Sequence, residues 1–124
     1  MSAIVARARG AIGCRFRVQG RDPTSGFDCV GLVGWACRAA VPGDYPARCG
    51  DAARAAGVLR AAGFVPVAQA RAGDVLVLLS APGQLHLGLW SGTGLIHADA
   101  AARAVVERPG VPPWPVLAVW RREA

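Results

Sequence analysis

From residue 75 to residue 120 the sequence is a succession of short apolar runs separated by Gly, Pro or Ser, the pattern of β-strands joined by tight turns. The runs cover residues 75–79, 85–90, 95–98, 104–107 and 116–120. The residues before them favour helices instead. Helices first and strands afterwards predict an α+β fold, with N-terminal helices packed on a five-stranded antiparallel sheet.

Three segments in the first half are predicted to be helical. Residues 2–12 form a short helix that ends near Gly13, and residues 51–62 form an Ala-rich helix closed by Gly63. Residues 30–40 are apolar almost all round, which is typical of a buried central helix. Asp28 occupies its N-cap position, so Cys29 falls in its first turn. We expect residues 1–124 to form one domain, because a chain of this length buries a single core.

The charge of the chain comes from fourteen arginines and no lysine, which with eight acidic residues give a formal net charge of +6. Such a charge could attract anionic polymers. The arginines are scattered without interleaved aromatic residues, so compositional bias explains them better and no nucleic-acid partner is predicted.

Membrane insertion is not predicted either. Arg7 and Arg9 interrupt the early apolar residues, so no signal-peptide core forms, and the apolar run 75–79 is too short to cross a bilayer. We therefore expect synthesis in the cytoplasm. Work outside the cell would then require lysis, a secretion machine or a carrier particle.

The four cysteines predict neither a metal site nor a disulfide framework. They contain no Cys-x-x-Cys pair, so no metal and no cofactor is predicted. Cys29 and Cys37 on one helix would lie about 12 Å apart, beyond the roughly 7 Å that a disulfide spans. Cys14, Cys37 and Cys49 are best explained as small buried hydrophobic residues.

Cys29 acquires a chemical role when it is considered with His86 and His97. A cysteine and two histidines supply a nucleophile, a base and an orienting group. We expect the helix N-terminus and an adjacent imidazole to lower the pKa of the Cys29 thiol. The Cys29 backbone amide is then the natural donor to an oxyanion. Spacing alone leaves open that the same three residues serve only in packing.

The hairpin around Gly92-Thr93 allows the relative positions of His86 and His97 to be predicted. If its turn is symmetric, Trp90 faces Leu95, and His86 and His97 are diagonal neighbours with Cβ atoms roughly 7 Å apart. Asp99 would oppose His86 in the same register and competes with His97 as the orienting group. A one-residue bulge would instead place the two histidines on opposite faces.

Several motifs in a fixed order carry a family resemblance from about Ala8 to Ala98. They are Ala-x-x-x-x-Gly-x-x-Phe-Arg, Gly-Phe-Asp-Cys-Val-Gly-Leu-Val, Ala-Gly-Asp-Val-Leu-Val, His-Leu-Gly-Leu-Trp and Leu-Ile-His-Ala. In these motifs the chain resembles the NlpC-type cell-wall cysteine peptidases. The resemblance implies a papain-like fold and cleavage of the γ-D-glutamyl to diamino-acid bond in peptidoglycan stem peptides.

The resemblance also assigns roles to residues. It implies that Cys29 is the nucleophile, His86 the base and His97 the third polar residue. Phe16 and Asp28 are expected beside the oxyanion and the substrate, although the local sequence favours a helix-capping role for Asp28. Phe16 departs from the family pattern, because the family usually has Tyr there.

Three functions are consistent with these features. The chain resembles the family branch encoded with phage tails and gene transfer agents, because it is compact and has Val30 where many members have Ser. The first function that we consider is therefore a peptidoglycan endopeptidase carried on such a particle, with baseplate or hub proteins as partners. The second is a structural hub or plug with a degenerate peptidase fold, docking through the Pro-rich loop around Trp114 and exposed arginines. The third is a thiol-dependent acyltransferase or amidase. The intact Cys29, His86 and His97 favour an enzyme.

Overall fold

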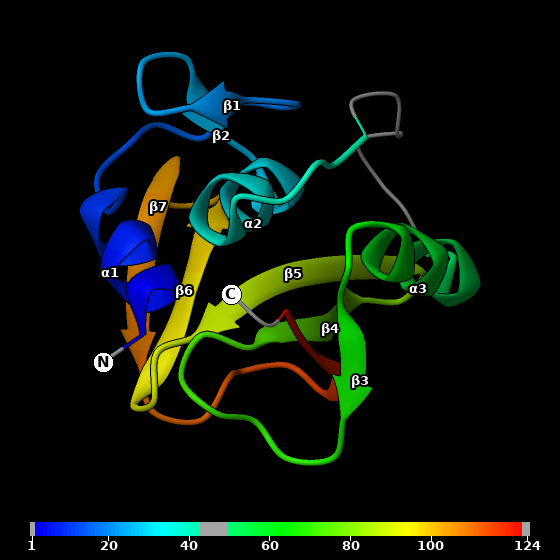
Figure 1. Ribbon diagram of the computed structural model, residues 1–124. Coiled ribbons are helices and arrows are strands. Elements are labelled where there is room, and N and C mark those ends of the chain that lie inside the picture. The colour runs from blue at the N-terminus through cyan, green and yellow to red at the C-terminus, as the bar shows by residue number, and fades with distance from the viewer. Residues whose placement is uncertain (1, 43–49, 123–124) are drawn as a thin grey trace.

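The computed structural model describes residues 2–42 and 50–122, which form helices packed on an antiparallel sheet (Figure 1). The α+β prediction is therefore confirmed. The helices are α1 (Ala3–Gly10), α2 (Cys29–Cys37) and α3 (Ala52–Ala61). The strands of the large sheet are β3 (Val65–Val67), β4 (Val75–Ala81), β5 (Gln84–Trp90), β6 (Gly94–Asp99), β7 (Ala104–Pro109) and β8 (Val116–Arg121), in the order β3-β8-β4-β5-β6-β7.

The predicted strand number is one too low, because the large sheet has six strands among the described residues and includes β3. This strand is short, exposed and contains Pro66, and proline within an apolar run argues against a strand. β3 tolerates the proline because it lies at the sheet edge and pairs with β8. A separate two-stranded sheet, formed by β1 (Arg21–Asp22) and β2 (Gly26–Phe27), precedes α2.

Apolar side chains cover both faces of the large sheet. α2 packs on β5 and β6, with α1 beside it (Figure 1). The main core lies on this side and includes Leu32, Leu89 and Ile96. A smaller cluster of Leu76, Leu78 and Leu95 lies apart from it, packed with Trp90, Trp114 and Val119. Alternation of side chains along the strands thus separates two apolar clusters.

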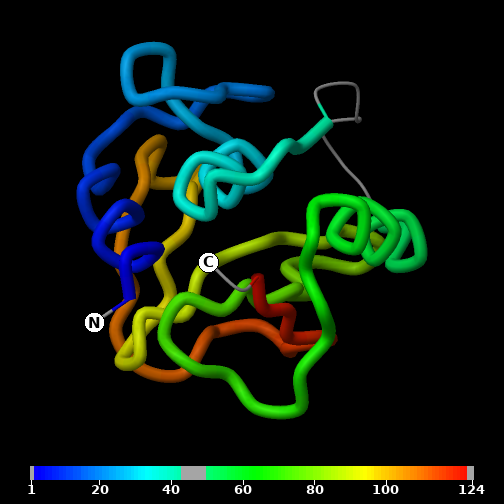
Figure 2. Tube along the Cα trace, viewed as in Figure 1, coloured from blue at the N-terminus to red at the C-terminus, as the bar shows by residue number. Residues whose placement is uncertain are grey.

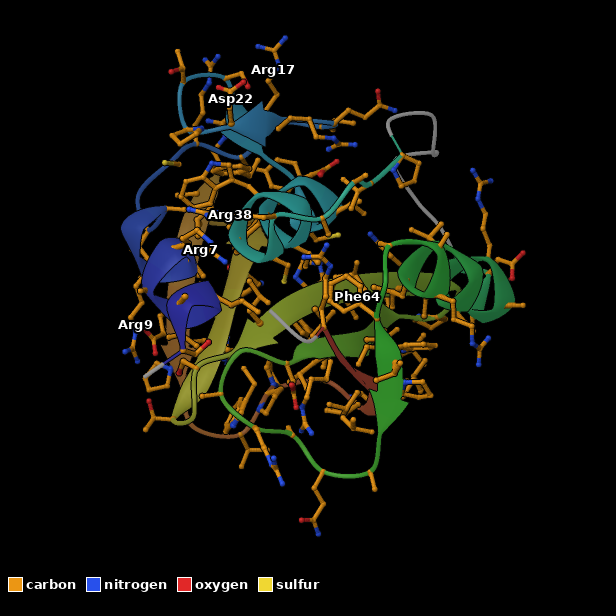
Figure 3. All side chains as sticks on the ribbon, in the orientation of Figure 1. Arg7, Arg9, Arg17, Asp22, Arg38 and Phe64 are labelled. Atoms are coloured by element: carbon orange, nitrogen blue, oxygen red, sulfur yellow. The ribbon has the colours of Figure 1, made fainter. Side chains whose placement is uncertain are left out.

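The central helix begins and ends at capped positions. Asp28 is its N-cap, as predicted, but the helix ends at Cys37, before the expected residue 40. Arg38 adopts the left-handed conformation, and the Ala39 amide donates to the Gly34 carbonyl, which closes the helix in a Schellman-type turn. Arg7, which lies between α1 and α2 (Figure 3), donates to the Ala36 carbonyl at 2.6 Å.

The two strands that carry the histidines pair only where their hairpin closes. Their register joins Leu89 to Ile96 and Trp90 to Leu95, which confirms the predicted symmetric turn. Away from the turn, β5 and β6 diverge (Figure 1), and the N-terminal end of α2 lies near the opening. The divergence leaves room for side chains from both strands and from the helix to meet.

The cysteines of the described residues are free thiols. Cys37 is buried, as predicted, whereas Cys14 is only partly buried against the main core. Cys49 lies outside the described residues. Within residues 2–42 and 50–122, no helix is long and apolar enough to cross a membrane.

Candidate functional site

A pocket of about 270 Å³ opens where α2 meets the diverging strands. Its wall is mainly apolar, with Val30, Val58 and Leu87 among its residues. The polar residues Arg54, Ser80 and Gln84 add to the wall from α3 and the β4–β5 hairpin. All five residues that the sequence singled out line this one pocket: Phe16, Asp28, Cys29, His86 and His97.

The two histidines form a hydrogen-bonded pair. His86 Nε2 and His97 Nδ1 lie 2.8 Å apart, and the ring planes are nearly perpendicular. The diagonal neighbours expected on adjacent strands therefore meet through their imidazole nitrogens. His97 is 1% exposed, and its Nε2 is a buried atom to which the described residues offer no hydrogen bond.

Burial disfavours the charged form of both histidines. It lowers the pKa of His86 to about 4, and the neighbouring His97 adds to the effect while Asp99 opposes it. The pKa of His97 is also lowered, by burial first, with Asp99 opposing and Arg108 reinforcing the shift. Both rings are thus neutral at pH 7, and a neutral imidazole can accept a proton.

The expected lowering of the Cys29 pKa is wrong. Although Cys29 is only partly buried as a residue, its pKa is raised to about 11, first by burial of the thiol and then by the charge of the Asp28 carboxylate. The backbone amides of Leu87, Val30 and Cys29 oppose this shift. The helix N-terminus therefore favours the thiolate as predicted, but burial is the larger effect.

The Leu87 amide, which lowers the pKa of the Cys29 thiol, belongs to the residue that follows His86 on β5. Cys29, His86 and His97 also line the same pocket, so the thiol and the histidine pair belong to one site. At rest the site holds a thiol and a neutral imidazole, because burial disfavours charge on both groups.

Asp28 is fully engaged in the structure that precedes the helix. Its Oδ1 accepts from the Gly31 amide at 2.8 Å and from Arg21 at 3.3 Å, while its Oδ2 accepts from the Gln19 amide at 2.7 Å. These contacts make Asp28 the N-cap that orients the first turn of α2. Asp28 thereby positions Cys29 in the first turn of α2 and places a negative charge near its thiol.

Phe16 and Asp99 occupy different surroundings. Phe16 is partly buried, packs against the main core and exposes part of its ring to the pocket. Asp99 accepts from the Ala101 and Ala102 amides at 2.9 and 3.2 Å, so its carboxylate closes the turn after β6. Among the described residues, the hydrogen-bond partner of the His86 ring is His97, and Asp99 acts on the histidines through its charge.

Sequence reasoning missed Trp114 as a site residue. It was considered as part of a docking loop, but its ring lies edge-on to His86 at 5.4 Å and to His97 at 5.7 Å between centroids. The Pro-rich composition of residues 109–115 indicated a loop, but not the direction in which the Trp114 ring points. Among the described residues, no group of three His, Cys, Asp or Glu side chains could hold a metal ion.

Comparisons with known proteins agree with this fold. No protein-family model and no curated protein sequence matches the chain. Among solved structures, the NlpC/p60 domain of the peptidoglycan hydrolase SagA is 30% identical, with a TM-score of 0.60 and 86% of each chain covered. The chain belongs to the NlpC/p60 domain family.

Two proteins of Mycobacterium tuberculosis show how this fold is used elsewhere. The peptidoglycan hydrolase RipB is 26% identical with a TM-score of 0.64; the match covers 96% of this chain but only 62% of RipB. RipD, described as a non-catalytic NlpC/p60 protein adapted to peptidoglycan binding, has a TM-score of 0.64 over 96% of this chain and 94% of its own. At 19% identity this second likeness shows the fold alone.

Proposed function

We propose that this protein is a cysteine peptidase that cleaves peptidoglycan stem peptides, with Cys29 as nucleophile, His86 as base and His97 as the residue that orients His86. The observation that carries the proposal is the hydrogen-bonded histidine pair in the same pocket as a cysteine at the first position of α2. Membership of the NlpC/p60 family and likeness to two peptidoglycan hydrolases support the substrate class.

In the first half of the reaction, His86 takes the thiol proton and the Cys29 sulfur attacks the scissile carbonyl. The S–C bond forms as the carbonyl π electrons move to oxygen, where the Cys29 backbone amide donates a hydrogen bond. The C–N bond then breaks, and the departing amine receives the proton from His86. A thioester on Cys29 remains.

In the second half, His86 takes a proton from water while the water oxygen attacks the thioester. Collapse of this intermediate breaks the S–C bond and returns the proton to the Cys29 sulfur. While His86 is an imidazolium, its Nε2–H donates to Nδ1 of His97, which holds the ring in place. An amine in place of water would make the same site an acyltransferase.

The pocket fits an acyl group of modest polarity with an anionic substituent. Its wall is largely apolar, and Arg54 contributes a cationic side chain at the start of α3. Stem peptides combine alanyl methyl groups with carboxylates.

We propose that the bond cleaved is the one between the γ-D-glutamyl residue and the diamino acid. We also propose that a phage-like tail or a gene transfer agent carries the protein to the cell wall.

A binding or plug protein without activity is the second candidate, because RipD shares this fold and is described as non-catalytic. Two features of the site favour this candidate: Phe16 replaces the usual Tyr, and the resting thiol has a raised pKa. The presence of Cys29, His86 and His97 in one pocket favours the enzyme.

Digestion of purified sacculi separates these candidates. Wild-type protein is expected to release fragments whose new termini, identified by mass spectrometry, map to one stem-peptide bond. Cys29→Ala should bind sacculi but release nothing. Binding by both proteins without new termini from the wild type would identify a binding protein, and transfer of the acyl group to an added amine would identify an acyltransferase.

A further inference from the structure

The ring cluster around the histidines points to a role for Trp114. The three rings of His86, His97 and Trp114 lie edge-on to one another, with centroids 5.0 to 5.7 Å apart and interplanar angles of 74 to 85°. These separations are those of favourable aromatic pairs. Because Trp114 contacts both partners of the hydrogen bond, neither imidazole can tilt without disturbing the indole.

Trp114 itself is held from two sides. It packs against the apolar cluster of Leu76, Leu78 and Leu95. Prolines precede and follow it, which restrict the backbone, and the Pro115 carbonyl accepts from the Leu79 amide at 3.0 Å. The connection from β7 to β8 runs from one edge of the sheet toward the opposite edge (Figure 2). Trp114 lies on this connection, so a loop outside the helices contributes to the site.

We propose that Trp114 is a positioning residue that shields the hydrogen bond between His86 and His97 from water and fixes the planes of both rings. This inference rests on the proposed function for its effect on turnover, but the shielding itself is a property of the protein alone. His97 is 1% exposed, and the lowered pKa values of both histidines have burial as their largest cause. Trp114 supplies part of that burial.

The chain offers a clean measurement, because His86 and His97 are its only histidines. Protein labelled with ¹⁵N-histidine is titrated by NMR as wild type and as Trp114→Leu and Trp114→Phe. Trp114→Leu is expected to raise the pKa of His86 by about one unit or more, because water enters beside the ring. Trp114→Phe should keep most of the shift. Asp99 and Arg108, which also act on this pair, stay in place in every variant.

Trp90→Leu is the matched control, since Trp90 packs against the same leucine cluster. It should lower stability without moving the histidine titrations. Unchanged titrations in folded Trp114→Leu, or equal shifts in Trp90→Leu, would overturn the proposal. If Trp114→Leu does not fold, the wild type decides: the proton between the two imidazoles should give a resolved downfield signal at neutral pH, and exchange too fast to detect it would also overturn the proposal.

Kinetics adds a second readout that depends on the proposed function. Trp114→Leu should lower kcat about tenfold with KM within about twofold, and Trp114→Phe should restore most of it. An effect on KM alone would make Trp114 a substrate contact and overturn the positioning role. Absence of cleavage by the wild type would refute the peptidase while leaving the NMR test of shielding intact.

Discussion

The reactivity of Cys29 should increase with pH, because its thiol is protonated at neutral pH. Its pKa is raised to about 11, so thiolate is scarce at pH 7 and increases with pH. Iodoacetamide labelling of Cys29 should therefore rise about tenfold for each unit between pH 7 and pH 9. Mass spectrometry of the labelled peptide measures this slope. A rate independent of pH over this range would indicate a preformed thiolate–imidazolium pair instead. Buried Cys37, whose pKa is raised to about 12, should be labelled more slowly throughout.

The histidines should differ in how much activity depends on each. His86→Ala removes the proposed base and should lower kcat about a hundredfold to ten-thousandfold. His97→Asn should cost less, because an amide can still hold the His86 ring. Asp99→Asn should change kcat least, since the Asp99 carboxylate is bound by the turn after β6. Stem-peptide cleavage measured for the three variants would identify Asp99 as the orienting residue if its replacement were the more damaging one.

Phe16→Tyr tests whether the ring beside the pocket limits turnover. Phe16 lines the pocket and is only partly buried, so we expect the added hydroxyl to donate to the developing oxyanion. One such donor is worth roughly 3 kcal/mol in a preorganised site. We expect kcat to rise with little change in melting temperature. Phe64, which lies inside the core (Figure 3) and is 2% exposed, provides the control.

In Phe64→Tyr the new hydroxyl would be buried without a hydrogen-bond partner. This should lower the free energy of unfolding by about 1 to 3 kcal/mol and leave turnover unchanged. Equal losses of stability in the two variants, with no gain in turnover from Phe16→Tyr, would mean that Phe16 is only a packing residue.

At the scale of the element, the Asp28 carboxylate has two effects at the N-terminus of α2: it caps the helix, and its charge raises the pKa of Cys29. Asp28→Ala removes the acceptor for two backbone amides and for Arg21, and should cost about 1 to 3 kcal/mol of stability. Asp28→Asn should cost less and, by removing the charge that raises the Cys29 pKa, should speed iodoacetamide labelling at pH 8. Urea denaturation and labelling rates measure the two effects.

Asp51 offers a matched control for that prediction. It is the N-cap of α3 and accepts from the Arg54 amide at 3.0 Å, but it is exposed. Asp51→Asn should change stability slightly and leave Cys29 labelling unchanged. Faster labelling in both variants would mean that the charge of Asp28 is not the cause.

At the scale of the whole molecule, one arginine joins three elements. Arg122, just after β8, donates to the Cys37 carbonyl at the end of α2 at 2.7 Å and to the Ala62 carbonyl after α3 at 3.0 Å. Cations near helix C-termini are favourable. Arg122→Ala should therefore lower stability by about 1 to 3 kcal/mol, measured by thermal or urea unfolding. Exposed Arg71→Ala should stay within about 0.5 kcal/mol. Equal losses of stability in the two variants would mean that the hydrogen bonds of Arg122 to the two carbonyls do not contribute to stability.

The arginines show where reasoning from composition stopped. Compositional bias accounted for their number, but Arg7 and Arg122 bind the last carbonyls of α2, and Arg121 forms a two-pronged ion pair with buried Asp74. Each of these contacts joins residues at least 29 positions apart in the chain. No local pattern indicates these pairings: Arg7 and Arg122 bind backbone carbonyls, which every residue possesses, and Asp74 lies 47 positions from Arg121 in the chain.

Local order in the chain determined the class of fold, the cap at Asp28, the place of Cys29 in the first helical turn and the register that brings His86 to His97. Each follows from short-range rules: capping chemistry, alternation along a strand and the length of a turn. The tertiary structure alone decided that β5 and β6 diverge to admit α2, that Trp114 closes over the histidines and that burial raises the Cys29 pKa. These depend on which distant segments exclude water from the site, and the solvation of a group is set by everything packed around it rather than by its neighbours in sequence.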